Sequence, residues 1–105
     1  MERRINVRGI VTDDNNHIFA VYHRERDTDV ELDFWAIPGG GLDVGESLEE
    51  ELVREFEEEL GIKPVIGRLL FMQQFIFTHR NGSQSEKMEF FFHIENTADF
   101  QHDID

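Results

Sequence analysis

A run of acidic side chains follows a glycine-rich loop in the middle of the sequence. Between Asp43 and Glu59 there are nine carboxylates, with Arg54 as the single basic residue among them. The segment 38–41, Pro-Gly-Gly-Gly, stands just before this run, and glycine lets a backbone turn sharply and approach a ligand closely. Carboxylate and carbonyl oxygens are the ligands that Mg²⁺ and Mn²⁺ prefer. The pattern therefore predicts a divalent-cation site.

The element that must position these carboxylates is a helix over residues 48–60. Ser47 is a good N-cap and Glu50 follows three residues later, which is the spacing of a capping box. Gly61 is placed to end the helix, and Pro64 prevents it from resuming. Apolar residues recur at intervals of four and form one stripe: Leu48, Leu52, Phe56 and Leu60.

Four of the carboxylates gather on one margin of this helix. At about 100° per residue, Glu51, Glu55, Glu58 and Glu59 converge beside the apolar stripe and partly against the core. Like charges at this spacing repel each other, so they need protons or cations. A solvated acidic face is the usual explanation of a Glu-rich helix, but the convergence and the glycines favour a cation site.

The spacing of these residues excludes several common motifs and matches another. No Gly-Lys-Ser/Thr follows the glycines, and residue 44 is Val where a dinucleotide fingerprint needs Gly. The chain instead has Gly40, five residues, Glu46, seven residues, and then the segment 54–62, Arg-Glu-Phe-Glu-Glu-Glu-Leu-Gly-Ile. This resembles the Nudix box, G-x5-E-x7-R-E-U-x-E-E-x-G-U with U apolar, at every fixed position.

The resemblance implies a role for each matching residue. By position, Glu58 and Glu59 resemble the principal metal ligands, and Glu55 resembles the third ligand or the base that deprotonates the attacking water. Gly40 resembles the residue whose backbone carbonyl joins the metal shell. The implied cofactor is Mg²⁺ or Mn²⁺.

Two further box residues resemble a structural pair. Glu46 and Arg54 resemble the ion pair that holds the loop to the helix. The whole box then implies a metal-dependent hydrolase, with a small nucleotide as substrate, that cleaves the pyrophosphate linkage of a nucleoside diphosphate joined to another moiety. The alternative is a catalytically silent nucleotide-binding or sensor module. The intact Glu55, Glu58 and Glu59 set favours the enzyme.

Residues outside the box are weaker candidates for substrate contact. Arg24 would meet phosphates, although a solvated loop is the simpler interpretation for its segment. Trp35 would stack on a base, although a lone Trp in a strand is more often part of the core. Glu89 is a candidate further ligand or base, in competition with Glu86.

The remaining elements are predicted as strands. Runs at 7–11 and 18–22 flank the turn-rich residues 13–16 and predict a hairpin, whereas the polar residues 23–33 predict a loop. Residues 34–37 predict a short strand, and 65–78 and 87–94 a hairpin around Asn81-Gly82. One helix among these strands indicates an α/β or α+β fold. The resemblance implies an α/β/α sandwich with a mixed sheet.

Size and charge limit the partners. The 105 residues suffice for one domain, and a net charge of −13 makes nucleic acid an unfavourable partner. With no Cys, no secretory signal and no run near the roughly 20 apolar residues of a membrane span, we expect a cytoplasmic protein. The resemblance implies a second helix that has no counterpart here, so residues 1–105 are predicted to be a single Nudix domain that is C-terminally truncated, completed by a partner chain, or a minimal member of the family. The apolar sheet face left uncovered predicts a homodimer.

Overall fold

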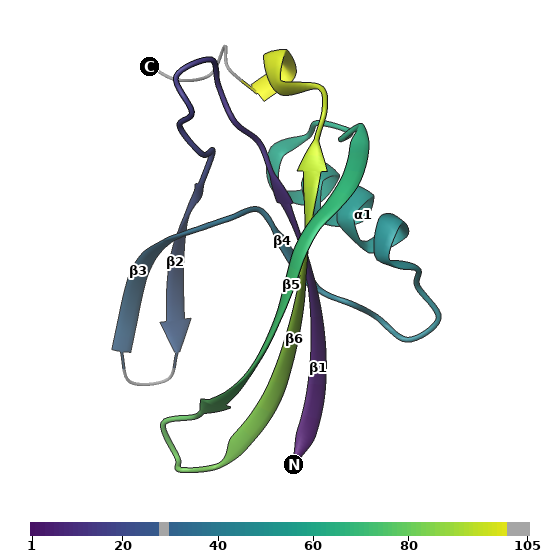
Figure 1. Cartoon of the computed structure of the whole chain (residues 1–105). Coiled ribbons are helices and arrows are strands. Elements are labelled where there is room, and N and C mark those ends of the chain that lie inside the picture. The colour runs from purple at the N-terminus through teal and green to yellow at the C-terminus, as the bar shows by residue number, and fades with distance from the viewer. Residues whose placement is uncertain (28–29, 101–105) are drawn as a thin grey trace.

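A mixed four-stranded sheet with one helix against it forms the body of the molecule (Figure 1). The computed structural model describes residues 1–27 and 30–100, with the backbone alone for the described part of 22–34. None of the helices in these ranges is long and apolar enough to cross a membrane. The elements are β1 (Glu2–Ile10), β2 (Val21–Asp27), β3 (Val30–Ala36), β4 (Gly39–Gly41), α1 (Leu48–Leu60), β5 (Ile66–Thr78), β6 (Gln84–Ile94) and the 3-10 helix η1 (Thr97–Phe100).

The strand β1 is one of the two inner strands of the main sheet. The strand order is β4-β1-β6-β5, with β1 parallel to β6 and the other neighbours antiparallel. In this register Val7 stands opposite Gly40 on one side, and Asn6 stands opposite Glu89 on the other. The glycine loop, the first strand and the sixth strand are thus adjacent although they are far apart in the sequence. The strands β2 and β3 form a separate two-stranded sheet beside the main one (Figure 1).

The core lies between α1 and the sheet. Leu52 and Phe56 of the predicted apolar stripe are fully buried and pack with Val7, Ile94 and other buried residues. Gly9 makes room for this contact, because a Cβ atom there would lie 2.6 Å from Cζ of Phe56. The predicted fold class is confirmed in its mixed sheet and single long helix.

Two of the predicted connections are wrong. The turn at residues 13–16 exists, but it is closed by one bridge between Thr12 and Ile18, and the chain then leaves β1. The polar side chains of residues 23–33 predict a loop, yet β2 and β3 pair with each other from Val21–Ala36 to Asp27–Val30. Strand pairing satisfies the backbone N–H and C=O groups of a polar segment as well as those of an apolar one. The polar side chains therefore gave no signal that this segment forms two strands.

The hairpin of β5 and β6 is confirmed, and it exposes much apolar surface. The turn contains Gly82 at φ 88°, a conformation that glycine tolerates. Phe91 is buried, whereas one edge of the sheet, β5, carries seven large apolar side chains that are 37–55% exposed. These seven residues are Leu69, Leu70, Phe71, Met72, Phe75, Ile76 and Phe77.

Candidate functional site

The ends of α1 are defined by its caps, and this sets which way its carboxylates point. The Ser47 backbone N–H donates to Oε1 of Glu50 at 2.9 Å, and the Glu50 N–H donates to Oγ of Ser47 at 3.1 Å. Gly61 ends the helix at φ 68°, and its N–H donates to the Glu57 carbonyl at 3.0 Å. The capping box and the glycine stop are both present, as predicted.

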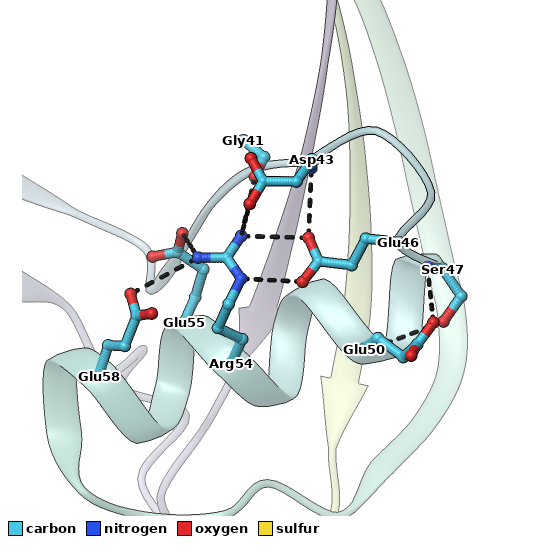
Figure 2. A network of polar contacts seen from close by, with 8 residues as sticks. All are labelled: Gly41, Asp43, Glu46, Ser47, Glu50, Arg54, Glu55 and Glu58. Atoms are coloured by element: carbon cyan, nitrogen blue, oxygen red, sulfur yellow. Dashed lines mark hydrogen bonds and ion pairs between the residues drawn. The ribbon is translucent and has the colours of Figure 1, made fainter.

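Arg54 connects the helix to the glycine loop (Figure 2). Its guanidinium donates to both carboxylate oxygens of Glu46, at 2.8 Å from Nε and 3.1 Å from Nη2. Nη2 also lies 3.3 Å from the Gly41 carbonyl and 3.5 Å from Oδ2 of Asp43. The hydrogen bond from Arg54 holds the pKa of Glu46 below its usual value and raises the pKa of Arg54 itself. The expected structural pair therefore lies between loop and helix.

The same guanidinium contacts two of the predicted metal ligands. Nη1 of Arg54 lies 3.1 Å from Oε1 of Glu55 and 3.5 Å from Oε2 of Glu58 (Figure 2). The side chain of Glu55 is mostly buried, and that of Glu58 is 59% exposed. Arg54 thus partly offsets the repulsion between the carboxylates of the helix.

Gly40 and Glu55 meet at close range. A Cβ atom at residue 40 would stand 2.7 Å from Oε1 of Glu55, which is closer than real Cβ contacts. The pairing of Gly40 with Val7 of β1 fixes the backbone at this point. The structure therefore brings together the backbone and one of the side chains that the resemblance assigns to the metal shell.

Two carboxyl groups of the acidic margin stand against the core. Burial raises the pKa of Glu59 to about 7, assisted by a hydrogen bond with Glu55 and opposed by the charge of Arg8. Burial, with the charge of Glu55, also raises the pKa of Glu51 to about 8. Glu51 is fully buried, and neither of its carboxylate oxygens has a hydrogen-bond partner in the described part of the chain.

Glu89 lies in a polar network between three strands of the sheet. Arg8 donates from Nε to Oε2 of Glu89 at 2.9 Å, and Gln73 donates to its Oε1 at 2.8 Å. Burial alone would raise the pKa of Glu89, but the hydrogen bonds of Arg8, Gln73 and Asn6 together keep it below its usual value. The sequence interpretation missed Arg8. The available signal was a cation in the otherwise apolar run from Val7 to Val11.

The other candidates for substrate contact are Trp35, Arg24 and Glu86. Trp35 is 69% exposed, so the interpretation as a core residue is wrong. The side chain of Arg24 lies outside the described residues. Glu86 contacts Arg3 and accepts a hydrogen bond from Gln74 at 2.7 Å. A groove of about 730 Å³ runs along α1 and is lined by Arg54 and Glu58 but not by Gly40 or the buried carboxylates.

The donor atoms suit a hard divalent cation. Carboxylate oxygens of Glu55, Glu58 and Glu59 and the backbone of Gly40 supply oxygen ligands alone, which is the set that Mg²⁺ and Mn²⁺ select. Over the described ranges, no three acidic or imidazole side chains already surround a common point. Arg54 contacts two of the donors instead. The two unpartnered oxygens of Glu51 are further donors within the same margin.

Comparisons with known proteins agree with the fold and the box. The model of the NUDIX domain family matches residues 2–105. An 8-oxo-dGTP diphosphatase of Escherichia coli (strain K12) is 41% identical over 58 residues, which are 53% of this chain and 42% of that protein. An RNA pyrophosphohydrolase of Shewanella frigidimarina (strain NCIMB 400) is 57% identical over 30 residues, 29% of this chain and 17% of that protein. The chain thus spans less than half the length of these curated relatives.

Solved structures show the same architecture. A MutT protein from Methanosarcina mazei Go1 superposes with a TM-score of 0.69 at 24% identity, over 88% of this chain and 62% of that one. A MutT NUDIX hydrolase from Burkholderia pseudomallei gives a TM-score of 0.64 at 27% identity, over 91% of this chain and 71% of that one. The mixed sheet with its helix is therefore an arrangement that solved proteins share.

Proposed function

Because this chain belongs to the NUDIX family, we propose that it hydrolyses the pyrophosphate linkage of a nucleoside diphosphate joined to another moiety, with a divalent metal ion. The observation that carries the proposal is the close approach of the Glu55 carboxylate to the Gly40 backbone, beside a margin of carboxylates that burial makes hard to ionise. Without a cation, it costs free energy to hold several partly buried carboxylates close together. Their oxygens are the ligands that Mg²⁺ and Mn²⁺ prefer.

Each side chain then has a distinct task. Glu58 and Glu59 hold the cation, with the Gly40 carbonyl, and Glu55 serves as a third ligand or as the base that accepts a proton from the attacking water. A bound divalent cation would neutralise phosphate charge and make that water more acidic. Arg54, through Glu46, keeps the loop at a set distance from the helix. Glu89 remains a candidate for substrate contact, held by Arg8.

The relatives suggest which substrates to test. The relatives are the 8-oxo-dGTP diphosphatase, the RNA pyrophosphohydrolase and a nucleoside triphosphatase of Enterobacter sp. (strain 638), which is 43% identical over 47 residues, so 8-oxo-dGTP, RNA and nucleoside triphosphates are the first compounds to test. The chain would be incubated with a panel of these compounds, nucleotide sugars, ADP-ribose and dinucleoside polyphosphates, with Mg²⁺, with Mn²⁺ and with EDTA. Phosphate release after phosphatase coupling would report cleavage.

The proposal expects cleavage of at least one panel member that stops in EDTA. Tight binding of a nucleotide without cleavage in either metal would instead show a silent binding module. Cleavage that continues unchanged in EDTA would contradict the role given to the carboxylates.

A further inference from the structure

Glu51 is the one carboxylate of the acidic margin that the box does not specify. It lies one helical turn before Glu55, at a spacing that places the Cβ atoms of the two residues about 5–6 Å apart. Its side chain is 0% exposed, and both of its oxygens lack a hydrogen-bond partner among the described residues. A buried carboxyl group in this state is costly, so its presence calls for a partner.

Within the described part of the chain, the two guanidinium groups that act on Glu51 are already engaged elsewhere. Arg8 and Arg54 are the guanidinium groups whose charges act on Glu51. Arg8 donates to Glu89 at 2.9 Å and to the Ile37 carbonyl at 2.8 Å. Arg54 donates to both oxygens of Glu46 and to Glu55. Neither guanidinium makes a hydrogen bond to Glu51.

Protonation of Glu51 does not remove its need for hydrogen-bond partners. Burial and the charge of Glu55 raise the pKa of Glu51 to about 8, so the carboxyl group would be largely neutral at pH 7. A neutral carboxyl group still carries an O–H that needs an acceptor and an oxygen that needs a donor. A cation between Glu51 and Glu55 would satisfy the lone pairs and remove the repulsion together.

We propose that Glu51 is an additional ligand for a divalent cation, which it shares with Glu55 at a position one helical turn before Glu58 and Glu59. This inference rests on the proposed function and extends its cation site toward the start of α1. The position needs two carboxylates, with the adjacent Gly40 backbone and water as further oxygen ligands. Two cations held a few ångströms apart are a common arrangement in enzymes that act on phosphate.

The test measures Mn²⁺ binding rather than catalysis. Wild type, Glu51→Gln, Glu51→Met and the control Glu57→Gln would be titrated with Mn²⁺, by calorimetry and by electron paramagnetic resonance of free Mn²⁺. Met keeps the length of the side chain without polar atoms, and Glu57 is an exposed carboxylate of the same helix. Thermal unfolding in EDTA would be recorded for all four proteins.

We expect both Glu51 variants to lose one Mn²⁺ equivalent or to bind at least about tenfold more weakly, with Glu57→Gln within twofold of wild type. In EDTA the Met variant should unfold at or above the wild-type temperature, because an unpartnered buried carboxyl group is removed. Wild-type stoichiometry and affinity in both variants would overturn the inference. So would lower stability of both variants in EDTA, since Glu51 would then have a partner within the protein. A wild type that binds no Mn²⁺ would overturn the proposed function as well. The result for the wild type therefore distinguishes failure of the proposed function from failure of the inference about Glu51.

Discussion

At the scale of single residues, adjacent glycines of the loop differ in what a methyl group would meet. A Cβ atom at Gly40 would stand 2.7 Å from the Glu55 carboxylate, whereas one at Gly41 would meet nothing closer than 3.8 Å. Gly40→Ala should therefore displace the end of a flexible side chain without unfolding the protein. We expect Mn²⁺ affinity to fall roughly tenfold, as is typical when the support of a metal ligand is lost.

Gly41→Ala is the matched control for this change. Neither glycine has a positive φ, so alanine is tolerated by the backbone at both positions. Calorimetric titration of both variants would show the difference. Equal affinities would mean that the contact between Gly40 and Glu55 has no part in cation binding.

Arg8 is the residue that motif spacing could not reveal. It pairs with Glu89, which lies 81 positions away in the sequence, because β1 and β6 run side by side. Arg8→Met should leave Glu89 buried with fewer hydrogen bonds, at a cost of roughly 1–3 kcal/mol in the free energy of unfolding. Urea unfolding would measure this cost, and Arg4→Met on the same strand, where the side chain is exposed, should be nearly neutral. Equal effects of the two substitutions would show that the network does not stabilise the sheet.

At the scale of elements, signals within the segment itself predict α1 fully. The pairing of strands could not be predicted, because it depends on residues that are distant in the sequence. The capping box of Ser47 with Glu50 and the stop at Gly61 are contained in the segment itself, so residues 48–60 could be assigned from the sequence. The partner of a strand is chosen by the whole fold. For that reason the sequence predicts a hairpin of residues 7–11 with 18–22, whereas the strand that begins at Val21 pairs with β3.

In the candidate site too, some features could be predicted from the local sequence and others depend on the whole fold. Residues of the box lie within 23 positions, and the helix geometry alone places their carboxylates together. The burial of Glu51 and Glu59 depends on how α1 packs on β1 and β4, which the sequence pattern indicated only as a margin beside the core. Exposure of Trp35 depends likewise on the position of β3.

The β5 strand gives a prediction about association. Its apolar side chains are exposed along one edge of the sheet, where strands pair readily with other chains. We expect the chain to self-associate at micromolar concentrations in sedimentation velocity. Ile76→Lys, at a side chain 55% exposed, should reduce this association, whereas Thr78→Lys at the end of the same strand should change it little. A monomer at all concentrations would contradict the prediction.

At the scale of the whole molecule, the shifted carboxyl groups set the pH dependence of stability. Folding raises the pKa of Glu51 and Glu59 from 4.5 to about 8 and about 7. Between pH 4.5 and 8 the folded protein therefore holds protons that the unfolded chain has released, and the free energy of unfolding falls as pH rises. The lowered pKa of Glu46 and of Glu89 acts in the opposite sense, because their stabilisation is lost as pH falls below about 4.5.

In EDTA, stability should thus be greatest near about pH 5 and decline toward pH 8. Thermal unfolding across this range would measure the decline, and Glu51→Gln should make it shallower because one of the two titrating groups is removed. Stability that rises from pH 5 to 8 in EDTA would contradict the burial of these groups.

The central claim is that the carboxylates on one side of α1 carry metal-dependent hydrolysis, and a comparison within the helix tests it most directly. With the substrate identified from the panel and Mg²⁺ present, turnover would be measured for wild type, Glu59→Gln and Glu57→Gln. Glu59 is partly buried on the acidic margin, whereas Glu57 is exposed on another face of the helix. We expect Glu59→Gln to lose at least about 10²-fold in kcat, or about 2.7 kcal/mol, and Glu57→Gln to stay near wild type. Equal losses in the two variants, with both folded by circular dichroism, would contradict the account.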